Sequence, residues 1–188
     1  ITEGDVQLSP TGQVTADLAA SGFKTTGRVA KHNFEFRRLQ KVTDNTSLLL
    51  ALSGQMASKN MASAEKFSLG GPGGVRAYPT GEGLGDTGWI FTAEGRYPVP
   101  GWKVGGGDVT LSGFWDQGWV QINENNPQTN AGVANNRRLS GYGVGASLGR
   151  DGDFVLRPSP AWRNENELPQ ADTAPRVPRV WVQAIKWF

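Results

Sequence analysis

The stretch FSLGGPGGVRAYPTGEGLGDTGWIFTAEGR, residues Phe67 to Arg96, joins a glycine-dense segment directly to a strand-like pattern. Eight glycines fall between positions 70 and 88, where they permit backbone angles and close approaches that other residues resist. Pro72 and Pro79 stiffen the backbone on either side of Arg76. The segment therefore predicts a shaped loop that presents one guanidinium at a fixed place.

A second pattern, from Arg138 to Gly149, alternates more regularly than any other part of the chain. Glycine and serine form one face, and the other carries Tyr142, Val144, Ala146 and Leu148. Such alternation indicates a β-strand, and glycines on one face allow close approach on the inner side of a curved sheet. We expect the larger side chains to face lipid and the glycines to line a lumen.

Similar alternation predicts an all-β, antiparallel protein with about eight strands. We place these strands at Thr2 to Leu8, Phe23 to Val42, Ser47 to Ala57, Gly88 to Tyr97, Asp108 to Gln121, Arg138 to Gly149, Phe154 to Arg163 and Pro178 to Phe188. The connections alternate between short (43 to 45, 98 to 107, 150 to 153) and long (9 to 22, 58 to 87, 122 to 137, 164 to 177). This asymmetry is typical of membrane barrels, which have short periplasmic turns and long extracellular loops.

The composition permits this interpretation. The chain has 188 residues, 26 glycines, no cysteine and a mean hydropathy of −0.42. It has no run of about 18 apolar residues, but spanning β-strands need only about 9 to 11 residues with alternate apolar positions. A formal net charge of +2, with scattered Lys and Arg, gives no reason to expect a nucleic-acid partner.

The glycine-rich loop also resembles a known sequence. Residues GGPGGVRAYPTGEGLGDTGW, with SGQMASKNMASAEKFSLGG before them and AEGRYPVP after, are similar to the long sixth loop of hemolysin-activator outer-membrane transporters. Downstream, Phe114-Trp115-Asp116-Gln117-Gly118 matches the F-x-D-x-G strand signature of the superfamily in which POTRA domains precede a barrel. The likeness extends more thinly to LSGYGVGASLG and RVWVQAIKWF.

This resemblance implies a transmembrane barrel of the bacterial outer membrane that exports a partner protein of hemolysin or adhesin type from the periplasm to the cell surface. A barrel-assembly insertase of the same superfamily and a passive porin-like channel are the alternatives. The expected partners are the secreted protein, the lipid bilayer and, during biogenesis, the barrel-assembly machinery. No enzymatic activity and no cofactor are expected.

The resemblance also implies sixteen strands in the intact barrel, so residues 1–188 are interpreted as its C-terminal half. A signal peptide and POTRA domains are absent from the sequence, which begins at Ile1. We therefore expect a mature or truncated piece of a longer transporter, formed by a barrel portion with a long loop at about 58 to 87.

The expected site is a latch that holds the loop against the inner wall. By resemblance, Arg76 pairs with Asp116, because a carboxylate in a polar lumen needs a cationic or hydrogen-bonding partner. Tyr78, Phe114 and Gly118 are expected beside this pair. The simpler interpretation is a solvated loop arginine and an acid in a wet lumen. Glu94 and Arg96 lie two apart on one strand face, either in the same charged network or solvated separately.

The chain terminus offers a different signal. Phe188 ends a strand with Val180, Val182 and Ala184 on one face, which resembles the last-strand signal for barrel assembly. Lys186 departs from that pattern, although a lysine near the membrane edge can extend its ammonium to water. Trp181 and Trp187 fall on the opposite face, toward either the lumen or an aromatic girdle.

Enzymatic and metal-binding interpretations have little support. The Gly141-Tyr-Gly-Val-Gly stretch lacks the strand, turn and helix context of a dinucleotide loop. His32 is the only histidine, and without cysteine the chain offers few partners for a metal site. Catalysis by Ser, His and Asp would need a nucleophile elbow that the sequence does not contain.

Overall fold

A computed structural model describes residues 2–7, 11–19, 22–125, 132–150, 152–164, 167–172 and 176–188. Eight antiparallel strands form one sheet in the order β1-β2-β3-β6-β7-β8-β9-β10. Their bounds are Thr2–Val6 (β1), Gly27–Thr43 (β2), Thr46–Ala57 (β3), Thr87–Val104 (β6), Gly107–Gln121 (β7), Asn136–Arg150 (β8), Phe154–Arg163 (β9) and Arg179–Lys186 (β10). The predicted all-β antiparallel fold is confirmed.

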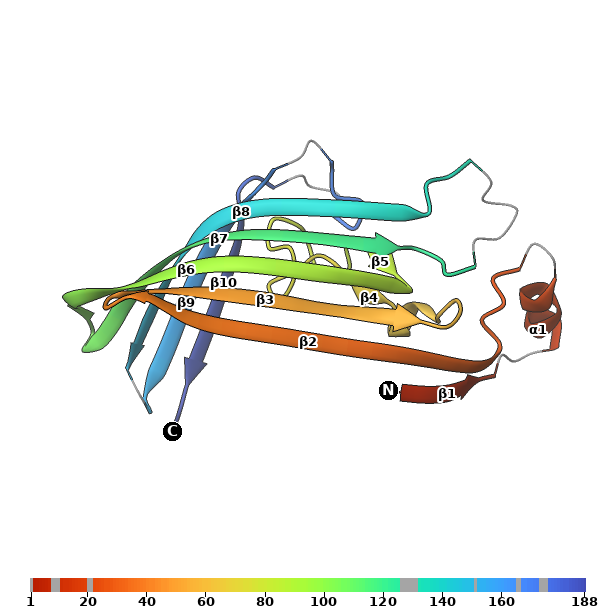
Figure 1. The fold of residues 1–188 in the computed structure, drawn as a ribbon, viewed down its shortest axis with the longest axis horizontal. Coiled ribbons are helices and arrows are strands. Elements are labelled where there is room, and N and C mark those ends of the chain that lie inside the picture. Colours follow the sequence, from red (N-terminus) through yellow and green to blue (C-terminus); the bar gives the residue numbers. More distant parts are fainter. Residues whose placement is uncertain are drawn as a thin grey trace.

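The sheet is curved but not closed. Each strand pairs with its neighbours in this order, and among the described residues β1 pairs with β2 alone and β10 with β9 alone. Figure 1 shows the strands bending around a hollow that holds the segment between β3 and β6. This arrangement is part of a barrel wall with the loop on its concave side.

The alternation of short and long connections is confirmed, but the bounds predicted for the short connection over 98 to 107 are wrong. The sequence predicts a turn over 98 to 107, because Pro98, Pro100 and Gly101 interrupt the alternation. Strand β6 instead continues to Val104, because a register shift between Pro98 and Lys103 absorbs the interruption. Pairing then resumes beside the ion pair of Lys103 Nζ with Asp108 Oδ1, at 2.7 Å.

Two other boundaries differ near the N-terminus. Helix α1, Thr11–Leu18, occupies the segment predicted to be a polar loop, and β2 begins at Gly27 rather than Phe23. Asp17 of the helix binds the backbone N–H groups of Thr25 and Thr26 at 2.9 and 2.8 Å, so these residues cannot extend the strand ladder. The predicted end of the first strand at Leu8 lies outside the described residues.

The two faces of the sheet differ in character. The convex face exposes large apolar side chains from several strands, among them Phe36, Tyr142, Val144, Val180 and Val182. Val144 is 53% exposed and Val182 64%. Among the described residues, no helix is both long and apolar enough to cross a membrane.

The concave face carries the core, which joins the loop to the wall. The loop between β3 and β6 contains a short 3-10 helix, η1 (Ser63–Glu65), and a small hairpin of β4 (Phe67–Ser68) and β5 (Leu84–Gly85). The buried apolar cluster consists of Leu69, Val75, Ala77 and Tyr78 from the loop and Ile90, Phe114, Val120, Leu139 and Ala161 from the wall. Each large side chain buried in this way stabilises the packed loop by about 1.5 to 3 kcal/mol.

Candidate functional site

Strand register places the acidic residues of the wall in adjacent rows. On the concave face, Asp116 of β7 lies opposite Thr92 of β6 and Gly141 of β8. In the next row, Phe114 lies between Glu94 and Gly143. Alternate residues share a face, so Thr92 and Glu94, like Phe114 and Asp116, point into the same hollow.

Arg76 at the tip of the loop binds Asp116 through three nitrogens. Its Nε and Nη2 donate to Asp116 Oδ2 and Oδ1, both at 2.9 Å, and its backbone N–H donates to Oδ2 at 3.2 Å. The Asp116 side chain is 1% exposed. A two-pronged guanidinium–carboxylate pair in such a buried place is strong and fixes orientation as well as position. The structure therefore brings together the two residues proposed as the latch.

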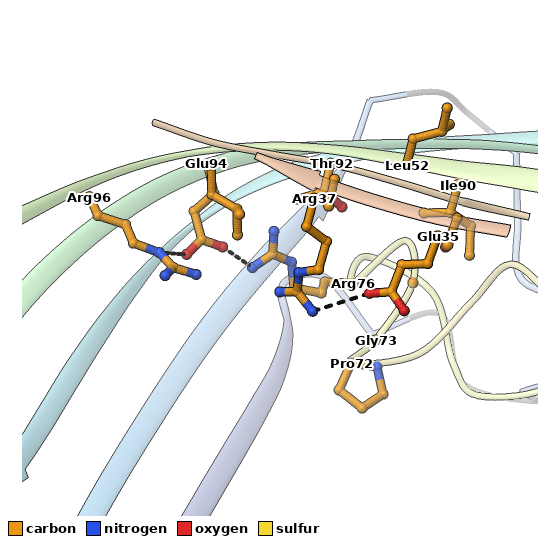
Figure 2. A pocket seen from close by; sticks show the side chains of 14 residues that line it. Glu35, Arg37, Leu52, Pro72, Gly73, Arg76, Ile90, Thr92, Glu94 and Arg96 are labelled. Carbon is orange, nitrogen blue, oxygen red and sulfur yellow. Dashed lines mark hydrogen bonds and ion pairs between the residues drawn. The ribbon is translucent and has the colours of Figure 1, made fainter. Parts of the chain in front are cut away.

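The contacts of Arg76 extend to a second carboxylate. Its Nη1 donates to Glu94 Oε2 at 2.8 Å, and Arg96 Nε donates to Glu94 Oε1 at 2.7 Å (Figure 2). Thr92 Oγ1 donates to Asp116 Oδ1 at 2.9 Å. Of the two interpretations left open for Glu94 and Arg96, the structure shows one charged network with Arg76.

These partners stabilise the protonated, positively charged form of Arg76. Burial of the guanidinium tends to lower the pKa of Arg76, but hydrogen bonds and charge from Asp116, followed by those from Glu94, raise it above its ordinary value. Because arginine is protonated in proteins at all ordinary pH, Arg76 carries its positive charge in this site.

Aromatic residues enclose the network. The guanidinium carbon of Arg76 lies 3.3 Å from the centroid of the Phe114 ring, which adds a cation–π contact. Tyr78 is completely buried in the same core, and its hydroxyl donates to the Glu167 carbonyl at 3.3 Å. The indole of Trp181 in β10 faces the hollow and donates to the Arg76 carbonyl at 2.8 Å.

Glycines of the wall make room for the loop. A Cβ at Gly118 would lie 2.7 Å from the Leu69 side chain, and one at Gly141 would lie 2.5 Å from the Ala77 Cβ. A Cβ at Gly143 would meet the Phe114 ring at 2.4 Å. These distances are too short for real contacts, so the glycines at the inner face of β7 and β8 allow the loop and the Phe114 ring to reach their places.

A polar cavity of about 210 Å³ lies beside the latch. Figure 2 shows that Arg37 and Glu35 of β2, Arg96 and Glu94 of β6, and Arg76 of the loop surround it. Among the described residues, no group of three or more His, Cys, Asp or Glu could hold a metal ion. The site is a charged contact between a loop and a wall.

Comparison with known proteins decides the family. The family described as haemolysin secretion/activation protein ShlB/FhaC/HecB matches residues 9–148. The chain belongs to this family. The family resemblance predicted from the loop and the F-x-D-x-G strand is thereby confirmed, together with the association with two-partner secretion.

Curated relatives include the heme/hemopexin transporter protein HuxB of Haemophilus influenzae. The chain is 27% identical to it over 171 residues, which make up 90% of this chain and 29% of that protein. HuxB of strain 86-028NP is 26% identical over 171 residues, with the same coverage. The chain thus spans less than a third of the length of these relatives.

Of the C-terminal residues, Trp181 contacts the latch, whereas the last residues of the chain bind the β8–β9 turn or solvent. Strand β10 ends at Lys186, and Phe188 lies two residues beyond it and is fully exposed. Lys186 pairs with Asp153 of the β8–β9 turn. Trp181 faces the hollow, which settles its orientation, while the Trp187 backbone N–H donates to the Asp153 carbonyl at 2.9 Å.

Analysis of the sequence alone missed two further acidic residues of the glycine-rich loop between β3 and β6. Asp86 is fully buried and binds Lys66 Nζ, the Met61 N–H and the Glu124 N–H at 2.9, 3.0 and 2.8 Å. Glu82 is buried beside Arg137 of β8. The signal was the GEGLGD segment, where two carboxylates lie in a glycine-rich loop; such a loop approaches other backbone closely, so its charges become buried.

Proposed function

We propose that the chain is the barrel portion, in its C-terminal half, of a sixteen-stranded outer-membrane transporter that passes a partner protein from the periplasm to the cell surface. Family membership supports transport of the two-partner-secretion type. The convex apolar face supports contact with a lipid bilayer, since barrel strands expose apolar side chains to lipid on alternate positions.

The observation that carries the proposal is the attachment of Arg76 to Asp116 and Glu94 on the concave wall. A passive channel has no need of a loop fixed inside its wall by a buried ion pair. In a transporter, such a loop occupies the lumen at rest and must be held in one place until a substrate arrives. The latch formed by Arg76, Asp116 and Glu94 serves this positioning.

The experiment is a secretion assay in the full-length protein, expressed together with a candidate partner, namely a large secreted protein whose gene is found beside that of the transporter. Arg76→Ala should reduce the amount of partner at the cell surface severalfold, because one substitution removes the bonds to both carboxylates. Arg38→Ala is the matched control, since Arg38 is an exposed arginine of β2 whose side-chain bond is to Gln40. Equal secretion by the two variants would contradict the proposal.

A further inference from the structure

Glu82 forms a second buried attachment of the loop, at a different place from Arg76. Glu82 is 1% exposed, and its carboxylate accepts hydrogen bonds from the backbone of another connection. The Gln170 N–H donates to Oε1 and Oε2 at 3.0 and 2.9 Å, and the Ala171 N–H donates to Oε2 at 2.8 Å. Residues 170 and 171 belong to the connection between β9 and β10.

Arg137 of β8 completes this attachment from the wall. Its Nη1 binds Glu82 Oε1, its Nε donates to Glu167 Oε1 at 2.5 Å, and its Nη2 donates to the Leu168 carbonyl at 3.1 Å. Arg137 is 8% exposed. One guanidinium therefore joins three parts of the chain: the loop, strand β8 and the β9–β10 connection.

The two attachments use different side chains. In the described part of the chain, no hydrogen bond or ion pair joins Glu82 or Arg137 to Arg76, Asp116 or Glu94. Glu82 is also tied to the other arm of the loop, because its carbonyl accepts from the Leu69 and Gly70 N–H groups at 3.1 and 3.0 Å. The polar bonds of Arg76 can therefore break without breaking those of Glu82.

We propose that Glu82 is a positioning residue that tethers the loop to the β9–β10 connection through Arg137, Gln170 and Ala171, separately from Arg76. The tip of the loop can then leave the wall while the loop stays attached at Glu82. The inference rests on the proposed function, because it assumes that the loop must move for transport. The inference adds that the loop pivots about Glu82 and does not detach completely from the wall.

Hydrogen exchange in the full-length protein, reconstituted in liposomes, tests the separation directly. The Gln170 and Ala171 amides should exchange about tenfold or more faster in Glu82→Gln, because a charged acceptor is lost. The same amides should exchange as in the wild type in Arg76→Ala. Glu65→Gln is the matched control, since Glu65 is an acid of the same loop that pairs with Lys31 at the surface.

Two further measurements separate positioning from a merely structural role. In planar bilayers, Glu82→Gln should raise the open fraction of the pore when added to Arg76→Ala, but should have little effect alone, because Arg76 still holds the tip. Arg137→Lys should accelerate exchange at 170 and 171 in the same way.

Faster exchange at these amides in Arg76→Ala would overturn the inference, because it would make the two attachments one unit. Loss of folding in both Glu82→Gln and Arg137→Lys would also overturn it, because these residues would then be needed for the fold itself and not only for positioning the loop. Neither measurement needs a secreted partner, so failure of the export assay and failure of this inference are distinguishable.

Discussion

At the scale of single residues, Asp116 is the wall partner on which the latch depends most. It accepts four hydrogen bonds, three from Arg76 and one from Thr92, and its side chain is almost fully buried. Glu94 accepts one bond from Arg76 and is also held by Arg96. If Arg76 leaves, Glu94 keeps a cationic partner and Asp116 keeps only the Thr92 hydroxyl, so most of the electrostatic cost of release falls on Asp116.

The interaction of Arg76 with Asp116 can be measured by a double-mutant cycle. Arg76→Ala and Asp116→Ala should each lower the free energy of unfolding by about 1.5 to 3 kcal/mol, because each removes charge-assisted bonds from a buried site. The double variant should be little worse than either single one, as monitored by denaturant unfolding in detergent micelles. Additive losses would show that the two residues act separately.

At the scale of elements, the alternation of β8 separates a convex face, which we propose meets lipid, from a concave face, which we propose lines a lumen. Val144→Arg should destabilise the protein in bilayers by about 2 to 4 kcal/mol, because it places a charge on the lipid side near mid-membrane. Thr110→Arg in β7 is the control, since Thr110 lines the groove on the concave side. Folding yield into liposomes measures both variants, and equal yields would mean that the faces are misassigned.

The contacts of Asp17 in helix α1 predict that the local stability of the junction between α1 and β2 depends on pH. Burial tends to raise the pKa of Asp17, but hydrogen bonds from Thr25 and Thr26 outweigh it and lower the pKa from 3.8 to about 2. A lowered pKa in the folded state means that the stabilisation is fully present above about pH 4 and is lost as the pH falls toward 2.

Exchange of the Thr25 and Thr26 amides should therefore accelerate, relative to the intrinsic rate at each pH, between about pH 4 and 2. Asp17→Asn should remove this dependence. A wild-type profile without any such change would contradict the assignment of Asp17 as the residue that holds this junction.

At the scale of the whole molecule, the loop and the curvature of the sheet depend on each other. An eight-stranded barrel has an interior only wide enough for its own side chains. The eight strands here remain open around a loop that packs against their concave side. If residues 1–188 closed on themselves, the loop would have to leave, which would expose Leu69, Val75 and Tyr78 and break the bonds of Arg76.

A cysteine reporter distinguishes these states, because residues 1–188 contain no cysteine; any cysteine elsewhere in the full-length protein is first replaced by serine. Val75→Cys introduces a side chain of similar size at a fully buried loop position, and Gly73→Cys is the exposed control on the same loop. In the full-length protein, a maleimide should modify position 73 quickly and position 75 slowly. In residues 1–188 folded alone as a closed barrel, both positions should react quickly; slow reaction at 75 there would contradict the argument.

The sequence predicted the parts of this protein that depend on local pattern. Alternation in residues 138 to 149 predicted a strand with opposite faces, and strand β8 shows them. The glycine and proline spacing around Arg76 predicted a shaped loop. The helix from Thr11 to Leu18 was missed, because its polar residues carry little helical periodicity of apolar side chains.

By itself, then, the sequence determined the fold class, the eight strands, the long loop and the family, because periodicity, turn residues and motifs are local properties. Only the tertiary structure decided which side chains meet: Glu94 with Arg76, and Glu82 with Arg137, 55 residues away. Such pairs depend on strand register and on the path of a glycine-rich backbone. A shift of one residue in register would turn Asp116 and Glu94 to the other face of the sheet. No local sequence pattern specifies which side chain of the loop will lie opposite them.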